Sequence, residues 1–396
     1  MNLEERLVAP LECAAGESGA AASLSVHAHV GLDALCACRD AWEALAEAAE
    51  VGPFQRPGLL IPLARELYSE DDAPVPFLVE VREQDRPIAF LPLIRLQRRG
   101  LDLVQWLGEP ICEYGDMIAD PRADRAGALE AALADKKALA GVDVIQLRKV
   151  RADAQIAPAF SYPGAIALEP REAPYIALSR YPTLDAYHAT LNARSRKSRR
   201  RARRKMEEAG SLSFTVLKPG EEAAMMTGLA IAYKKAWLEA EGLASRTFMA
   251  PVNTRSLMAM AETPGTGCRV SVLKLGDAPA AIEIGFIAGG DYLSYLAAMA
   301  PDHIALGPGK IQLEETLVWA SGENIRRFDL LAPADPYKLG WAEDQIGVSD
   351  LVLPRSLAGK LHTALFLKML RPGLKGLFHM VPRDLRRVVA KKILHG

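Results

Sequence analysis

The stretch Asp277-Ala278-Pro279-Ala280-Ala281 lies between two apolar runs, and Asp85-Arg86-Pro87-Ile88-Ala89 repeats its plan about 190 residues earlier. Aspartate and proline favour turns, so each stretch predicts a tight turn between two strands. Beyond each turn the sequence predicts another strand, a helix and a strand with an aspartate, Asp143 in the first copy and Asp329 in the second. The chain is therefore predicted to contain two copies of one α/β module.

The two copies differ just before their helices. The second copy has Gly307-Pro308-Gly309-Lys310 there, whereas the first has Pro121 and Arg122 near the corresponding point. Glycines let the backbone turn tightly and bring N–H groups to the first helical turn, where the helix dipole favours an anion. Lys310 adds a positive charge. The pattern indicates a pyrophosphate site, but an ordinary strand-to-helix turn can have the same composition, so both interpretations stay open.

Composition favours two globular units followed by a basic tail. The chain has 396 residues, half of them hydrophobic, which is enough for two sizeable cores. Residues 355–396 contain ten Lys or Arg and one acidic residue, Asp384, so this segment carries +9 while the preceding 354 residues carry −10. A basic tail of this kind is typical of contact with phosphate, nucleic acid or anionic lipid.

Four segments are predicted from these patterns. Residues 1–25 are rich in Ala, Gly and Ser and are predicted to be disordered. Residues 26–175 form the first lobe and residues 176–354 the second, with a proline-rich stretch ending at Pro174 as the linker between them. Residues 355–396 are predicted to form amphipathic helices, which either pack on the body or lie on a membrane surface.

The cysteines and the apolar runs indicate a cytoplasmic protein. The five cysteines form no CxxC pair and no zinc-like spacing with the histidines, so reduced thiols and no metal are expected. No apolar stretch reaches the roughly 18 residues of a membrane-spanning helix. The N-terminus has Glu4, Glu5 and Arg6 where a signal peptide would become apolar.

A run of basic residues marks the start of the second lobe. Nine of the twelve residues from Arg194 to Lys205 are basic. Small and apolar residues recur every three or four positions through the run, which predicts a helix with one narrow packing face and outward-facing arginines. Three interpretations remain: a solvated helix face, a site where Arg196 and Arg200 bind a phosphate-bearing acceptor, and a nucleic-acid site. The last is the weakest because no aromatic residue interleaves the run.

The chain resembles a known family in the order and spacing of several elements: the arginine run, the Pro279 turn, Tyr292 to Tyr295, the glycine turn, Phe328-Asp329-Leu330 and Tyr337-Lys338. Together they are similar to the CelD-like branch of the GNAT acyltransferases, over about residues 30–345. That branch resembles the Fem-type peptidyltransferases, which contain two tandem GNAT lobes.

This resemblance implies two tandem lobes, each a mixed sheet flanked by helices, and acyl transfer to an amine, usually from acyl-CoA and without a metal. It also implies an acceptor among exopolysaccharides or cell-envelope precursors, such as an amino sugar or a lipid-linked sugar. The sequence departs from the usual GNAT pyrophosphate pattern, because Ala305 and Leu306 precede the glycines where Arg or Gln is usual. An aminoacyl-tRNA donor, as in the Fem-type enzymes, and a non-catalytic binding or regulatory protein on the same scaffold are the alternatives.

Acyl transfer from a thioester needs a neutral amine and a protonated leaving thiolate. Asp329 at a strand end, Glu283 within an apolar strand and Asp116 at the lobe interface are the candidate bases, and each has a structural alternative. Tyr295 is the candidate acid for the thiolate.

Lys338 and Tyr337 follow the Asp329 strand by a short loop and are expected to overlook the same cleft, where Lys338 would bind an anionic part of donor or acceptor. A surface lysine is the alternative.

Overall fold

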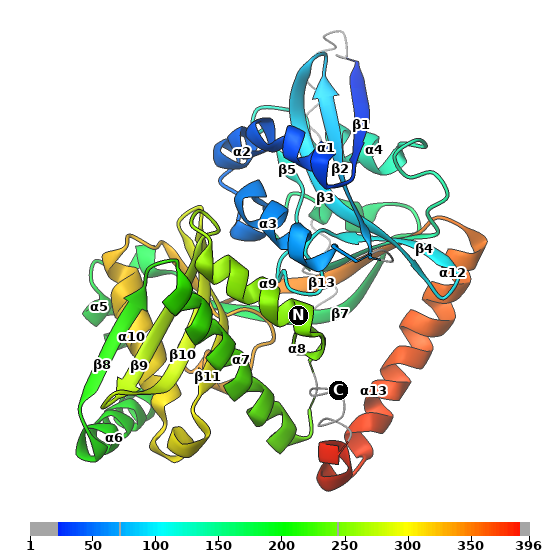
Figure 1. Cartoon of the computed structure of the whole chain (residues 1–396). Coiled ribbons are helices and arrows are strands. Elements are labelled where there is room, and N and C mark those ends of the chain that lie inside the picture. The colour runs from blue at the N-terminus through cyan, green and yellow to red at the C-terminus, as the bar shows by residue number, and fades with distance from the viewer. Residues whose placement is uncertain (1–22, 71–72, 244, 389–396) are drawn as a thin grey trace.

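One mixed sheet runs through the whole molecule. The computed structural model describes residues 23–70, 73–243 and 245–388, and thirteen strands within them form a single sheet. Twelve strands follow in the order β1-β2-β3-β4-β6-β13-β7-β12-β11-β10-β9-β8, and β5 pairs with β3. Figure 1 shows two lobes with helices on the faces of their sheets. The predicted α/β architecture is confirmed.

The first lobe is built around a strand hairpin and a helix that crosses between two parallel strands. Its strands are β1 (Leu24–Val30), β2 (Val75–Glu83), β3 (Arg86–Arg98), β4 (Leu101–Trp106), β5 (Ile118–Ala119) and β6 (Val144–Arg151). Its helices are α1 (Leu32–Ala37), α2 (Arg39–Ala48), α3 (Pro57–Leu67) and α4 (Arg125–Ala134), with short 3₁₀ turns η1 (Pro53–Gln55) and η2 (Ala157–Ser161).

The second lobe repeats this plan. Its strands are β8 (Leu212–Leu217), β9 (Cys268–Leu275), β10 (Ala278–Ala288), β11 (Asp291–Met299) and β12 (Arg327–Asp329). Its helices are α5 (Leu184–Thr190), α6 (Ala193–Ala209), α7 (Glu221–Glu241), α8 (Arg246–Met249), α9 (Pro251–Glu262), α10 (Pro308–Gly322) and α11 (Pro336–Leu339). The 3₁₀ turns are η3 (Leu178–Arg180) and η4 (Pro301–Leu306).

The two hairpins match residue by residue. In β2–β3 the register shifts next to Val81, and in β9–β10 it shifts next to Leu273, which is the same distance from the turn. The two-residue turns also agree, since Gln84 and Gly276 both have positive φ, 57° and 59°. Tight hairpins of this type require such a conformation. The repeat seen in the sequence is thus a repeat of structure.

The lobes exchange their last strands. β7 (Ile166–Ile176) follows the first lobe in the sequence but pairs with β12 of the second lobe, and β13 (Asp344–Pro354) follows the second lobe but pairs with β6 of the first. β7 and β13 also pair with each other along most of their length. The sheet is therefore continuous because each lobe supplies the other with a strand.

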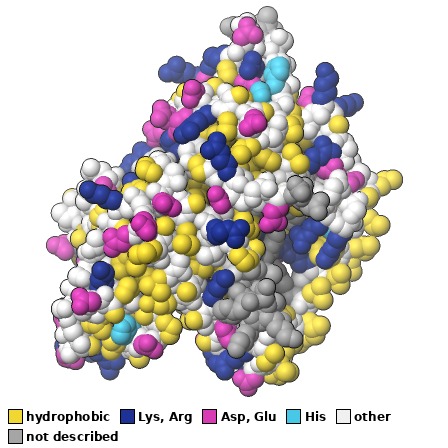
Figure 2. Space-filling model, viewed as in Figure 1, with side chains coloured by type: hydrophobic (Ala, Val, Ile, Leu, Met, Phe, Trp, Pro, Cys, Tyr) yellow, Lys and Arg dark blue, Asp and Glu magenta, His cyan; other side chains and the backbone are white. Residues whose placement is uncertain are grey.

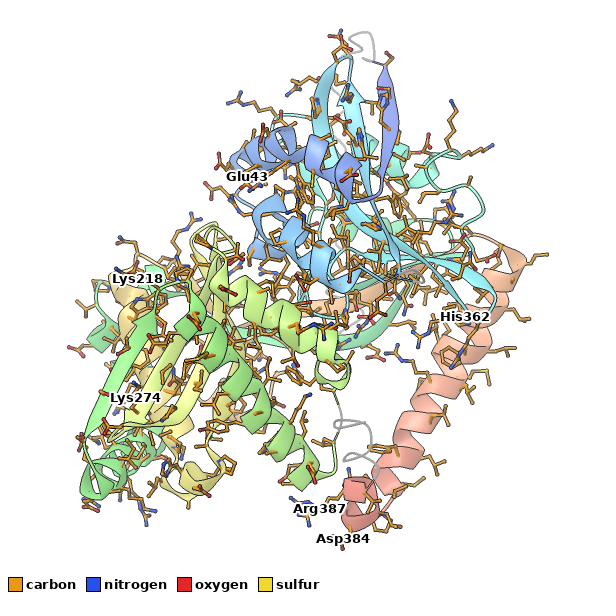
Figure 3. All side chains as sticks on the ribbon, viewed as in Figure 1. Glu43, Lys218, Lys274, His362, Asp384 and Arg387 are labelled. Atoms are coloured by element: carbon orange, nitrogen blue, oxygen red, sulfur yellow. The ribbon has the colours of Figure 1, made fainter. Side chains whose placement is uncertain are left out.

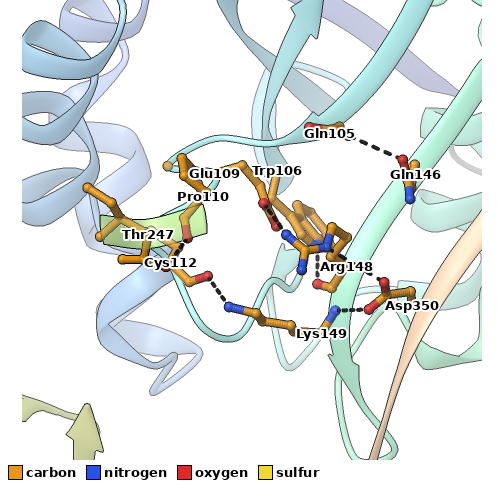
Figure 4. Close-up of polar contacts among 12 residues, drawn as sticks. Gln105, Trp106, Glu109, Pro110, Cys112, Gln146, Arg148, Lys149, Thr247 and Asp350 are labelled. Atoms are coloured by element: carbon orange, nitrogen blue, oxygen red, sulfur yellow. Dashed lines mark hydrogen bonds and ion pairs between the residues drawn. The ribbon is translucent and has the colours of Figure 1, made fainter. Parts of the chain in front are cut away.

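A buried carboxylate holds the exchanged strand β13 in place (Figure 4). Asp350 is fully buried and accepts a hydrogen bond from the backbone N–H of Lys149 at 3.0 Å. Lys149 has φ 56°, so β6 bulges at this point and turns that N–H toward β13. The guanidinium groups of Arg148 and Arg171 lie 3.6 Å and 3.2 Å from the same carboxylate.

Part of the predicted proline-rich linker is a strand. Pro170 and Pro174 both lie in β7, so the linker prediction is wrong there. Proline cannot donate a hydrogen bond, which argued against a strand. Pro170 is tolerated because β7 bulges beside it, where Glu169 has φ 51° and the register with β13 shifts.

Other boundaries also differ from the sequence patterns. β1 begins at Leu24, inside the segment predicted to be disordered, and residues 1–22 lie outside the described residues. The periodicity that begins at Leu184 predicts one helix through the arginine run to Glu208. The structure has two helices there, α5 and α6, because the Asn192 side chain caps a new helix by accepting from the N–H of Ser195.

A helical arm follows β13. It consists of α12 (Leu357–His362), a π-helical segment η5 (Thr363–Leu370) and α13 (Arg371–Met380). Figure 1 shows these segments as one long rod that leaves the first lobe and descends beside the second. Helices were predicted in this tail, and the part beyond residue 388 lies outside the described residues.

The lobes share one hydrophobic core. A single cluster of buried side chains includes Trp42 and Leu60 from the first lobe and Ile282 and Phe286 from β10 of the second. α3 packs against α9 across this boundary. The lobes are therefore joined by side-chain packing as well as by strand exchange.

Candidate functional site

The glycine turn forms the start of α10. Gly307 is the N-cap and adopts the left-handed conformation, with φ 77° and ψ 43°, which suits glycine best. No side chain of the described residues caps this end of the helix. A Cβ atom on Gly309 would lie 3.0 Å from the sulfur of Met299, so a larger residue would crowd β11. The first-turn N–H groups and the positive end of the dipole therefore face outward without a carboxylate of the protein.

In the first lobe, a side chain occupies the N-terminus of the equivalent helix, α4. The N-cap of α4 is Asp124, whose carboxylate accepts a hydrogen bond from the N–H of Gly127 at 3.0 Å. This negative charge occupies the place where an anion would bind. Of the two corresponding helix starts, only that of α10 is free of such a carboxylate.

The arginine helix α6 lies beside the glycine turn. Lys310 donates a hydrogen bond to Ser198 at 2.9 Å, and a Cβ on Gly307 would lie 3.6 Å from that of Ala202. The narrow packing face expected in this run is present, since Ala202 and Met206 are buried. One arginine turns inward against that expectation: Arg199 is buried and stacks over Trp341 at 4.2 Å.

The two arginines predicted to bind substrate have different surroundings. Arg196 donates to the carbonyls of Ala189 and Leu191, at 2.9 Å and 2.7 Å, and so caps the end of α5. Arg200 is exposed on the outer face of α6. The exposed cations of that helix are Arg194, Lys197, Arg200, Arg201, Arg204 and Lys205.

Asp329 lies at the end of β12, where β11 and β12 separate. β11 continues beyond Leu293, the last residue of β11 that pairs with β12. The carboxylate is fully buried and accepts from the hydroxyl of Tyr114 at 3.0 Å and the N–H of Leu331 at 2.7 Å. Arg151 of the first lobe lies 3.4 Å away. Burial raises the pKa of Asp329, and the positive charge of Arg151 offsets part of that rise.

Glu283 lies on the opposite side of the sheet, beneath α10. Its carboxyl group accepts from the hydroxyls of Tyr292, Ser294 and Thr316, at 3.0 Å, 2.8 Å and 3.3 Å. Gln312 extends the network by donating to Thr316. Burial raises the pKa of Glu283 to about 7. Glu283 and Asp329 therefore do not share a site. A carboxyl group within an apolar strand needs buried partners, and for Glu283 these are the three hydroxyls.

Tyr295 and Lys338 both contact backbone carbonyls. The hydroxyl of Tyr295 donates to Ile111 of the first lobe at 3.0 Å. Lys338 is buried and donates to Leu331 at 2.8 Å, beside Asp329, and burial lowers its pKa. Lys338 thus lies next to the loop that follows Asp329, and its role in binding an anion remains a prediction. Tyr337 is exposed, and the centroid of its ring lies 6.0 Å from the Nζ of Lys338.

Asp116 lines a cavity of about 200 Å³ between the two lobes. Its carboxylate accepts from the N–H groups of Met117, Gln155 and Ile156, at 2.7 to 2.9 Å, and burial raises its pKa to about 7. These bonds fix the surrounding loop. The prediction that Asp116 lies across the lobe interface agrees with this position, while its substrate-binding role remains a prediction.

Several residues of this cavity have no recognisable sequence signal. Arg151 and Arg327, which pair with Asp153 and Asp291, line its wall together with Tyr114. They come from different lobes and meet only because of the strand exchange. Acidic groups outnumber the two arginines, so the cavity suits a cationic or amine-bearing molecule. In the described residues, no group of three His, Cys, Asp or Glu is placed to hold a metal ion.

Comparison with known proteins agrees with this architecture. Residues 193–339, which lie in the second lobe, match the family model "Acetyltransferase (GNAT) domain". The matched region contains α6, the glycine turn, Glu283, Asp329 and Lys338. A search of the curated proteins finds no match.

Solved structures extend the likeness to both lobes. The structure of FemX is similar over 83% of this chain and 98% of its own, with a TM-score of 0.59 and 11% identity. A C-terminal domain assigned as a lysylphosphatidylglycerol synthetase, from Agrobacterium fabrum, covers 83% of this chain and 95% of its own, with a TM-score of 0.50 and 12% identity. These likenesses concern the fold.

Proposed function

We propose that this protein is an N-acyltransferase that moves an acyl group, in the first instance acetyl, from acyl-CoA to an amino sugar of an exopolysaccharide or cell-envelope precursor. The observation that carries the proposal is the difference between the two helix starts. α10 begins at a left-handed glycine with no capping side chain and lies beside the cations of α6, whereas Asp124 fills the same place in the first lobe. The pyrophosphate of the donor would bind at Gly307, Gly309 and Lys310.

The adjoining basic face favours a donor with several phosphates. Arg201 and Lys205 are exposed on α6, in the helical turns next to Ser198 and Ala202, which contact the glycine turn. CoA has a pyrophosphate and a further phosphate on its ribose, so these side chains would contribute attraction that weakens with salt. This proposal assigns Arg201 and Lys205 of the arginine run to the donor, and the acceptor-binding role of Arg196 and Arg200 stays a prediction.

The acceptor would occupy the cavity between the lobes. Its excess of carboxylates attracts an ammonium group, and Asp329 lies behind Tyr114 and Arg151 at its wall. Asp329 would take the proton of the ammonium, directly or through water, so that the neutral nitrogen can attack the thioester carbon. The carbon–sulfur bond then breaks, and the hydroxyl of Tyr295 would give its proton to the leaving thiolate. The nitrogen would lose its second proton, through water, to the Tyr295 oxygen, and Asp329 would release the first proton to solvent. The products are an amide and free CoA.

Binding of acetyl-CoA tests the donor assignment. Calorimetry on the wild type should show binding, and Gly309→Asp should abolish it because it adds a negative charge to the first turn of α10, close to the anion position. Gly309→Asn is the matched control, with the same shape and no charge, and should retain part of the affinity, with at least about tenfold tighter binding than the aspartate variant, equivalent to about 1.4 kcal/mol. Equal affinities in the two variants, or no binding by the wild type, would refute the assignment.

Turnover separates the donor alternatives. Acetyl transfer to an amino sugar that saturates with acetyl-CoA and survives ribonuclease treatment would support the proposal. Activity that requires charged tRNA would establish the Fem-type aminoacyl alternative. Asp329→Asn should reduce turnover while leaving the dissociation constant of acetyl-CoA unchanged, and unchanged turnover would assign Asp329 a structural role only.

A further inference from the structure

The helical arm is fixed to the body at both ends. At its upper end Leu367 packs among Leu101, Leu103 and Val352 of the first lobe. Beyond its lower end Arg383 and Arg387 donate to the carbonyl of Ala240, at 3.0 Å and 2.8 Å, near the end of α7. Figure 3 shows Arg387 and Asp384 at this lower contact and His362 at the upper one. The arm therefore has a defined inner side and a defined outer side.

The outer side is apolar. Ten of the eighteen large hydrophobic side chains that are exposed in the described residues lie between positions 357 and 388, so the exposure is concentrated in this segment. We call the following six residues the outer stripe: Leu357, Leu361, Leu365, Met369, Leu377 and Met380. Between 54% and 83% of each is exposed. Figure 2 shows hydrophobic side chains along the outer edge of the molecule at the arm.

The π-helical segment contributes to the alignment. Side chains four residues apart drift around an ordinary α-helix, because four residues exceed one turn of 3.6 residues. A π-helix takes more residues per turn, so Leu361, Leu365 and Met369 remain close to one line through η5. The stripe extends over the 24 residues from Leu357 to Met380, a length that an α-helix would span in about 35 Å.

All charged residues of the arm itself are basic, and one of them, Arg371, pairs with Glu169 of the body at 3.1 Å. No acidic residue occurs between Asp350 and Asp384. Lys360 and Lys368 are exposed on the arm, and Arg99 lies over the ring of Phe366 at 4.1 Å, on the inner side. An occupant of this surface must therefore offer both an apolar layer and negative charge.

We propose that the outer stripe docks on the surface of an anionic lipid bilayer. A straight, exposed helix edge fits a plane, whereas a small ligand needs a concavity. A second copy of the arm would bring two surfaces without carboxylates together, which like-charge repulsion disfavours. A bilayer accepts the leucine and methionine side chains between its head groups, and its anionic lipids attract the lysines. This surface is separate from the glycine turn and the cavity between the lobes.

Vesicle sedimentation with the full chain tests the proposal. Wild type should bind vesicles of phosphatidylcholine and phosphatidylglycerol at 3:1 at least about tenfold more strongly than vesicles of phosphatidylcholine alone, and 1 M salt should weaken the binding. The variant Leu361→Ser/Leu365→Ser/Met369→Ser should lose at least about tenfold of the anionic binding. Lys360→Gln/Lys368→Gln should reduce the preference for anionic vesicles.

The control is Met225→Ser/Val318→Ser, which changes similarly exposed residues elsewhere and should bind like the wild type. Thermal unfolding of each variant checks that the body is intact, and acetyl-CoA binding should be unaffected by the stripe variant. The proposal is overturned if the wild type does not bind anionic vesicles or if the stripe variant binds them equally well. The proposal is also overturned if the wild type is a dimer and the stripe variant is a monomer, because the stripe would then bind a second copy.

Discussion

The two lobes share one backbone plan but differ in what lies beneath the helix that crosses each sheet. Four buried positions in the first lobe are apolar: Val79, Leu91, Leu129 and Leu133. The corresponding positions in the second lobe, matched by strand register and by distance from the helix N-cap, are polar: Ser271, Glu283, Gln312 and Thr316. At these positions α4 makes hydrophobic contacts, whereas α10 makes hydrogen bonds in addition to its hydrophobic packing through Ile311, Leu313 and Leu317.

This difference bears on how firmly α10 is oriented. Apolar packing tolerates small shifts, whereas a fully buried hydrogen-bond network has few acceptable geometries. The polar copy is also the one whose helix begins at the uncapped glycine turn. Burial of the Glu283 carboxyl group therefore lowers the stability of the second lobe, while the hydrogen bonds around that group restrict the position of α10.

The largest expected effect comes from separating the lobes. Fragments 1–175 and 176–396 should each fail to show a cooperative urea transition, because β7 and β13 would each be cut away from the strand they pair with in the other lobe. Coexpressed fragments should associate and elute together, since the exchanged strands can then pair. A fragment with its own cooperative transition would show that the strand exchange is dispensable for folding.

The next effect concerns the pairing of β13 with β6 and β7. Asp350→Ala should lower the free energy of unfolding by about 3–5 kcal/mol, because it leaves Arg148, Arg171 and the N–H of Lys149 without their buried partner. Asp344→Ala, on the same strand, removes the more exposed pair with Arg180 and should cost less than about 1 kcal/mol. Urea denaturation measures both free energies of unfolding, and equal decreases for Asp350→Ala and Asp344→Ala would contradict a special role for Asp350.

A pH effect distinguishes the polar interior from the apolar one. Folding raises the pKa of Glu283 to about 7, so the folded protein binds this proton more tightly than the unfolded chain. Its contribution to stability is present below the unfolded pKa and is lost as pH rises through about 7. Glu283→Gln should therefore gain about 3 kcal/mol relative to wild type between pH 4.5 and pH 8. Parallel stability curves for the two proteins would exclude this titration.

The smallest effect concerns the cap of the first lobe. Asp124→Ala should lower stability by about 1 kcal/mol through loss of the α4 N-cap, with a modest fall in melting temperature. Acetyl-CoA affinity should not change, since the proposed donor site lies at α10. A change in affinity would mean that the first lobe contributes to the donor site.

The sequence allowed the local elements of both copies to be predicted well. The sequence predicts a strand over residues 212–217 and a long helix over residues 221–241, and β8 and α7 have these bounds. The hairpins about Asp85 and Asp277 are also confirmed. These features depend on short-range turn chemistry and hydrophobic periodicity. β7 was missed because its prolines indicated a linker, and only the bulge at Glu169 makes a strand possible there.

Less of the candidate site could be predicted from the sequence. Asp329 and Lys338 lie close together as predicted, because they follow one strand by a short loop. Glu283 was grouped with them but faces the opposite side of the sheet, since alternate strand residues point in opposite directions and β10 bulges after Ile284. Tyr114 and Arg151 contact Asp329 from the other lobe, and no local pattern indicates a contact between residues so far apart.

The exchange of β7 and β13 also sets an order of events during synthesis. β6 ends at Arg151, but its partner β13 ends only at Pro354, 203 residues later. At about 5–20 residues per second the first lobe waits roughly 10–40 s for its missing strand after β6 has been made. During that time the edge of β6 is an unpaired template, open to strand pairing with other chains or to binding by a chaperone.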